Sequence, residues 1–143
     1  MMTITQTRQL EPRAALAWAV GASVLAGAAM GLGVYAYALR VADSGSAVAA
    51  LAGVAVAWSG GIAGSVLSVG ALGRAPLAQA HGALAGLATR FGVTLLGALA
   101  IATLAVVALR PFLLAVGGAH LIFLAVDVAM LIWLRRRVTG EAA

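Results

Sequence analysis

Four long apolar runs dominate the sequence, and the only charges within them are Arg90, near the start of the third run, and Asp127 in the fourth. A helix that crosses a bilayer needs about 20 consecutive apolar residues. The runs predict spans at about residues 14–39, 47–70, 87–109 and 112–134. Only 9% of the residues are charged and 64% are hydrophobic, whereas a soluble domain has about 25% charged residues. We therefore expect an all-α integral membrane protein, with residues 1–143 forming a single membrane domain of two antiparallel hairpins.

The connections between the runs carry turn signals. The first run is too long for the roughly 7–15-residue apolar region of a cleaved signal peptide, so it is expected to remain as a span. Asp43 or Ser44 is suited to cap the second helix, because both side chains accept hydrogen bonds from backbone N–H groups. Pro76 fits a loop or the first turn of the third helix.

The distribution of arginine predicts the orientation of the chain. Four spans place both termini on one side, and arginine is enriched on the cytoplasmic side of membrane proteins. Seven arginines fall on the side of the termini and two on the other. The seven are Arg8, Arg13, Arg74, Arg90, Arg135, Arg136 and Arg137; the two are Arg40 and Arg110. Both termini are therefore expected in the cytoplasm.

Arg90 and Asp127 are expected to form an ion pair inside the membrane. Arg90 precedes the turn at Arg110 by 20 residues, and Asp127 follows that turn by 17. At about 1.5 Å per residue the two differ by roughly 4–5 Å in depth, which an arginine side chain can span. We predict that they face each other across the hairpin of the third and fourth helices. The pair is either a structural clamp or a site for a partner or ion.

His120 and Thr94 are the other polar residues expected at membrane depth. His120 lies seven residues before Asp127, so both are expected on one face of the fourth helix, directed into protein. One interpretation is a proton relay. The other is a histidine that is hydrogen-bonded to a backbone carbonyl or to a threonine of the third helix.

Pairs of glycines four residues apart recur along the first three helices. This spacing lets helix backbones approach closely in lipid. The pairs are Gly27 and Gly31, Gly60 and Gly64, and Gly82 and Gly86; Arg90 and Thr94 continue the last stripe. We expect these positions to pack within the chain, with contact to another subunit as the alternative.

The same sequence argues against several functions. It has no cysteine, which excludes disulfides and cysteine-ligated metals. No phosphate-binding loop, catalytic triad or carboxylate pair is visible, so no enzyme activity is expected. One histidine and one aspartate at membrane depth are too few for a metal site. Apart from the run at 135–137, the arginines are scattered singly between apolar runs, which favours a topology signal over nucleic-acid binding.

Two segments resemble the ATP synthase subunit I family, the small accessory membrane proteins of bacterial rotary ATP synthases. GLATRFGVTLLGAL, residues 86–99, resembles the start of the family's third span, with Arg90 as its basic residue. HLIFLAVDVAMLIW, residues 120–133, resembles the fourth span, with Asp127 as its acid. The acid that some members carry just before the basic residue is absent, since Ala88 and Thr89 stand there.

The resemblance implies a non-catalytic factor of the bacterial inner membrane that assists assembly or stability of the rotor c ring. Its expected partners are membrane lipid and the c subunit or other membrane subunits. A role in supplying Mg²⁺ has been suggested for the family, and no other cofactor is expected. The alternatives are a small ion or proton channel or transporter that uses Asp127, His120 and Arg90, and an unrelated structural subunit or holin-like protein. A small multidrug exporter is disfavoured, because the first span has no acid.

Overall fold

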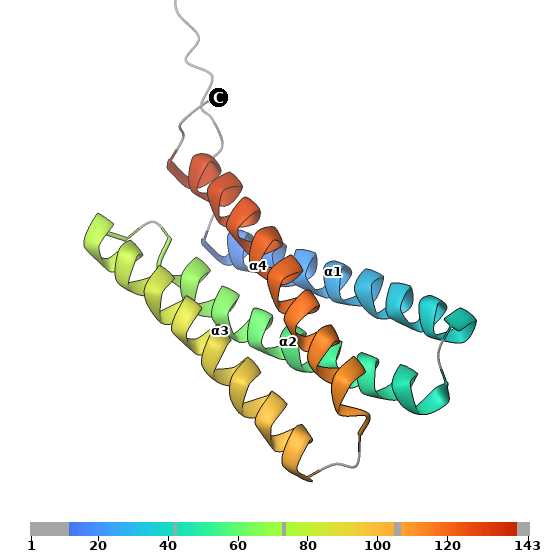
Figure 1. The fold of residues 1–143 in the computed structure, drawn as a ribbon. Helices are drawn as coiled ribbons and strands as arrows, with labels where there is room; N and C mark the ends of the chain where they lie inside the picture. The colour runs from blue at the N-terminus through green and yellow to red at the C-terminus, as the bar shows by residue number, and fades with distance from the viewer. Residues whose placement is uncertain (1–11, 42, 73, 105–106, 140–143) are drawn as a thin grey trace, which may run out of the picture.

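Four long antiparallel helices make up the described part of the chain (Figure 1). The computed structural model describes residues 12–41, 43–72, 74–104 and 107–139. The helices are α1 (Pro12–Val41), α2 (Ser44–Gly70), α3 (Pro76–Leu104) and α4 (Leu109–Thr139). All four are long and apolar enough to cross a membrane, where a helix satisfies its own backbone hydrogen bonds without water. The predicted all-α class and four candidate spans are confirmed.

Two helices begin earlier than the sequence predicted. α3 begins at Pro76 rather than near residue 87, so that Gln79 and His81 belong to its first turns and not to the connection. α4 begins at Leu109 rather than at residue 112. Proline suits the first turn of a helix, because the N–H that it lacks would have no partner there. The predicted polar amino-terminal segment with Arg8 and Glu11 lies outside the described residues.

Asp43 is the residue that caps α2. Its backbone is extended, and its carboxylate accepts a hydrogen bond from the backbone N–H of Ser46 at 2.6 Å. This contact satisfies one of the amides that the first turn of a helix leaves without a partner. The turn between α1 and α2 is therefore fixed by the residue type that the sequence analysis singled out.

α2 is the central helix, and it packs against each of the other three. Three apolar clusters follow its length. The cluster at the end of α2 joins Ala15, Ala19, Val69 and Leu134. The middle cluster contains Val54, Ala57, Ala119 and Phe123. The cluster at the start of α2 contains Ala49, Val56, Ala98, Phe112 and Val116.

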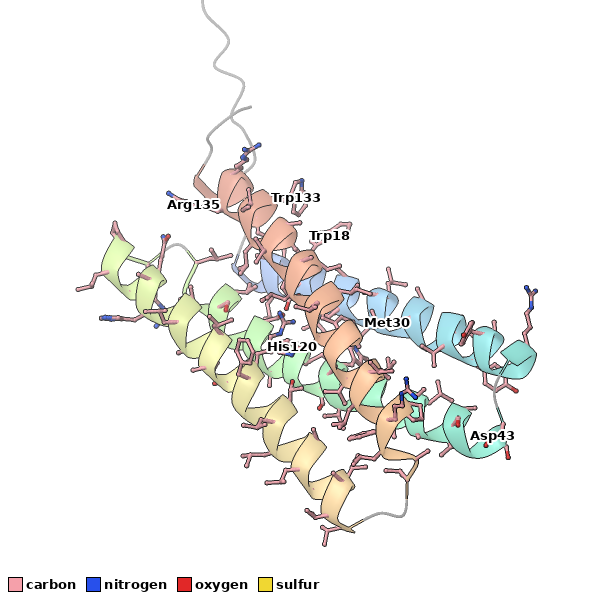
Figure 2. All side chains as sticks on the ribbon, viewed as in Figure 1. Trp18, Met30, Asp43, His120, Trp133 and Arg135 are labelled. Atoms are coloured by element: carbon pink, nitrogen blue, oxygen red, sulfur yellow. The ribbon has the colours of Figure 1, made fainter. Side chains whose placement is uncertain are left out.

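The start of α1 and the end of α4 lie at the same end of the molecule. Ala15 of α1 and Leu134 of α4 share a cluster, and the rings of Trp18 and Trp133 meet edge to face with centroids 6.2 Å apart. Both rings are labelled in Figure 2. α3 and α4 approach each other near their connection and diverge toward the beginning of α3 and the end of α4 (Figure 1).

Candidate intramembrane ion-pair site

Glycines bring α2 and α3 into close backbone contact beneath the site. A Cβ placed on Gly64 would lie 2.6 Å from the carbonyl oxygen of Gly86, and one on Gly60 would lie 2.8 Å from that of Arg90. Gly86 also faces the side chain of Ser68, and Gly82 packs on Ala71. Any side chain at these positions would force the helices apart. The structure therefore places Gly60, Gly64, Gly82 and Gly86 in packing within the chain.

The two glycines of the α1 pair, Gly27 and Gly31, have different surroundings. Gly27 packs against the indole of Trp58, whose Nε1 donates a hydrogen bond to the carbonyl of Ser23 at 2.9 Å. A Cβ on Gly31, by contrast, meets no atom of the described residues within 4 Å. Gly31 instead lines a cavity against Leu51 and Ala55 of α2. Trp58 fills the space beside Gly27, whereas the space beside Gly31 is open.

Arg90 of α3 and Asp127 of α4 form an ion pair in the interior. The Nη2 atom of Arg90 donates to Oδ2 of Asp127, and the hydroxyl of Ser65 on α2 donates to the same oxygen at 2.9 Å. Arg90 is 3% exposed and Asp127 is 7% exposed. One carboxylate thus joins three helices. The structure brings together the two charges that the sequence paired.

The route by which Arg90 reaches Asp127 differs from the one expected. α3 and α4 pack against each other only slightly along the hairpin, and both pack mainly on α2. A Cβ on Gly61 would lie 3.0 Å from Nη2 of Arg90, so the absence of a side chain there leaves room for the guanidinium. Gly64 likewise lies beneath the Cβ of Arg90. The arginine therefore extends across the glycines of α2.

Ser65 and Gly61 are the site residues that the sequence analysis missed. They are four residues apart, and they form a second small-residue stripe one position beyond Gly60 and Gly64. The first stripe of α2 faces α3, and the second faces the ion pair and α4. The signal was present, but in a chain with 18 glycines the spacing alone does not say which stripe carries the polar contact.

The arrangement neutralises two charges that would be costly alone in hydrocarbon. An isolated charge at membrane depth is strongly unfavourable, and a partner of opposite sign with a further hydrogen bond offsets much of that cost. The buried Nε of Arg90 has no hydrogen-bond partner within the described residues. The site is thus a neutral, three-helix contact.

His120 lies close to this site without joining it. It is 8% exposed, and its ring packs at a tilt on Phe91 of α3, with centroids 4.6 Å apart. Figure 2 shows it directed into the bundle. Neither ring nitrogen has a hydrogen-bond partner among the described residues, and neither does the hydroxyl of Thr94. The expected hydrogen bond of His120 to a carbonyl or to a threonine is therefore wrong for the described structure, because Phe91 covers the ring instead.

Fold and site together define a four-helix, all-α membrane protein with a buried ion pair that joins α2, α3 and α4. Within the described ranges, no three histidine, aspartate or glutamate side chains gather closely enough to hold a metal ion. A scan against protein-family models and searches of curated proteins and of solved structures gave no match to this chain.

Proposed function

We propose that this chain is a non-catalytic accessory factor of a bacterial rotary ATP synthase, which assists assembly or stability of the rotor c ring. Two sequence segments support the proposal through their resemblance to subunit I, residues 86–99 and 120–133. They supply the two halves of one contact, since Arg90 comes from the first and Asp127 from the second. The two segments that resemble subunit I therefore meet at one contact, the ion pair of Arg90 and Asp127.

The observation that carries the docking role is a stripe on α1 in which the small residues Gly21, Ala28 and Gly31 alternate with larger ones. Its members are spaced so that they share one helix face: Gly21, Val24, Ala28, Gly31 and Tyr35. All are exposed except Gly31, which is half-buried. A cavity of about 230 Å³ lies between this stripe and α2, where Leu51 and Ala55 form the other wall.

Such a stripe suits a helical hairpin as its partner. Lipid tails are as apolar as leucine, so helices associate in membranes chiefly by close van der Waals packing over small residues. The α1 stripe and the adjoining cavity offer that packing to a hairpin of the c subunit. The buried ion pair then keeps α2, α3 and α4 together while α1 contacts the partner.

Co-purification tests this function directly. Tagged protein would be extracted in mild detergent and probed for the c subunit, with Gly31→Leu as the test variant and Gly117→Leu as the matched control. A Cβ at either position meets no described atom within 4 Å, so both substitutions are expected to leave the fold intact. We expect wild type and Gly117→Leu to recover the c subunit and Gly31→Leu to lose it by about tenfold. Equal recovery with Gly31→Leu, or no c subunit from membranes with intact synthase, contradicts the proposal.

His120 favours a second candidate function, a small ion or proton channel or transporter that uses Asp127, His120 and Arg90. The observation is that both of its buried ring nitrogens have no described partner. This function predicts pH-dependent flux in vesicles that Asp127→Asn abolishes, whereas His81→Gln, at an exposed position, leaves it unchanged. An assembly factor is expected to give no flux.

A further inference from the structure

A continuous groove runs between α3 and α4 where the two helices diverge. It consists of two adjoining cavities of about 190 Å³ and 410 Å³, which share Ser68, Ala83 and Leu131 in their linings. The inner cavity reaches the ion pair of Arg90 and Asp127. The outer cavity extends to Gln79 at the start of α3 and Arg135 near the end of α4. We call this feature the α3–α4 groove.

The walls of the α3–α4 groove suit hydrocarbon rather than water. Small residues of α2 form its floor, including Gly64 and Ser68, and apolar side chains such as Leu87 and Val128 form its sides. At its inner end Arg90 and Ser65 already donate to Asp127, while Nε of Arg90 has no hydrogen-bond partner within the described residues. Space beside apolar atoms that no other atom fills loses dispersion contacts, and an apolar lining offers a water too few hydrogen-bond partners. A hydrocarbon chain fits this lining better than water does.

The mouth of the groove, in contrast to its apolar walls, is polar and charged. Arg135 lines it together with Gln79, and Figure 2 shows the Arg135 side chain leaving α4 away from Trp133 and Trp18. Tryptophans mark the level of lipid headgroups, so Arg135 lies close to that level. Among the described residues, Arg74, Arg135 and Arg136 are exposed at this end of the molecule. The mouth is therefore positively charged, and it complements an anion.

The dimensions match one leaflet of a bilayer. Asp127 precedes Arg135 by eight residues, which corresponds to about 12 Å along a helix. Half of a hydrocarbon core of about 30 Å is about 15 Å. A chain whose headgroup sits at Arg135 thus ends close to the depth of the ion pair.

We propose that the α3–α4 groove binds one anionic phospholipid, with its phosphate at Arg135 and Gln79 and an acyl chain between α3 and α4. Basic pockets between transmembrane helices on the cytoplasmic side are known to hold such headgroups. The chain would complete the packing of α3 against α4 where their own side chains do not meet. This site is separate from the α1 stripe, so it does not depend on the proposed assembly function.

Native mass spectrometry of the full-length protein tests the site. Protein in detergent would be offered phosphatidylglycerol or phosphatidylcholine with the same acyl chains. Arg135→Gln removes the charge at the mouth and Ala83→Phe fills the groove; Arg40→Gln and Ala88→Phe are matched controls at exposed positions outside it. We expect one retained phosphatidylglycerol, a preference of about tenfold over phosphatidylcholine, and a similar loss in both test variants but in neither control.

Three results would overturn the proposal. Equal retention of the two lipids would remove the headgroup site. Retention of phosphatidylglycerol by a folded Ala83→Phe variant would place the lipid on the arginine surface, with no chain in the groove. Displacement of the lipid by inorganic phosphate alone would indicate a free-anion site. If Ala83→Phe fails to fold, Ala83→Leu with a circular dichroism check of helix content makes the same distinction.

Discussion

At the scale of single residues, the molecule is organised around one carboxylate. Asp127 accepts from Arg90 and from Ser65, so three helices meet at its Oδ2 atom. Both members of the ion pair are nearly inaccessible. In such surroundings, removing one charge costs more than removing both, because the survivor is left buried without a partner.

This asymmetry gives a prediction for Arg90 and Asp127. We expect Arg90→Ala or Asp127→Ala alone to lower the free energy of unfolding by about 3–5 kcal/mol. The double variant Arg90→Met/Asp127→Leu, which replaces the pair with apolar side chains of similar size, should lose much less. Thermal unfolding in micelles measures all three. A double variant as unstable as the sum of the two single variants would show that the charges do not act as a pair.

Asp43 gives a prediction that depends on pH. The hydrogen bond from the Ser46 backbone N–H lowers the pKa of this exposed carboxyl. A lowered pKa in the folded state means that the stabilisation is present above the unfolded pKa of about 3.9 and is lost as pH falls through the folded pKa. Asparagine caps a helix about as well but carries no charge. The higher melting temperature of wild type over Asp43→Asn at pH 7 should therefore disappear in acid; a difference that stays constant down to pH 3 would contradict this.

At the scale of elements, α2 determines how the helices pack. Its glycines admit the backbone of α3 on one side and the guanidinium of Arg90 on the next. A helix in lipid gains little from apolar burial, so close approach over small residues is the main source of its packing energy. The α2–α3 contact therefore depends on the absence of side chains.

The glycines of α2 and α3 give a matched pair of substitutions. In Gly64→Ala the new Cβ would lie 2.6 Å from the Gly86 carbonyl oxygen and 2.9 Å from the Arg90 Cβ, and we expect a loss of about 1–3 kcal/mol from overpacking. In Gly92→Ala the Cβ meets no described atom, so the variant should be neutral or gain up to about 1 kcal/mol in helix propensity. Unfolding measurements on both variants check the contrast, and equal effects would exclude a tight α2–α3 contact.

The sequence predicts much of the arrangement of the helices, and there are physical reasons for the features that it does not predict. Apolar length identifies four helices, and relative depth pairs Arg90 with Asp127. The predicted span begins near residue 87 although α3 begins at Pro76, a position that the sequence analysis left open between a loop and a first turn. An apolar run marks the part of a helix in hydrocarbon and not the turns that extend beyond it. The hydrogen bond from Ser65 to Asp127 was not predicted. Which face of a helix a residue occupies depends on how the helix is rotated, and that rotation is set by packing and not by sequence spacing.

At the scale of the whole molecule, the distribution of arginines indicates on which side of the membrane the termini lie. Arg90 belongs to the interior, so it no longer counts as a loop residue. Six arginines then remain on the side of the termini against two on the other. The sign of the bias is unchanged, and we continue to expect both termini in the cytoplasm.

Single cysteines test this orientation cleanly, because the chain has none of its own. Ser44→Cys marks the α1–α2 turn, and Ala75→Cys marks the connection before α3; both positions are exposed. On intact spheroplasts, a membrane-impermeant maleimide should label Ser44→Cys, and it should label Ala75→Cys only after lysis. The reverse pattern would place the termini outside.

The most direct test of the central claim asks whether the buried charges or the α1 stripe recruit the c subunit. The measurement is co-purification of the c subunit with the folded Arg90→Met/Asp127→Leu variant, beside Gly31→Leu. We predict that the variant without the charges retains the c subunit, because Arg90 and Asp127 are 3% and 7% exposed, and that Gly31→Leu loses it. Loss of the c subunit from the folded charge-free variant, with retention by Gly31→Leu, would contradict the account and make the ion pair the docking site.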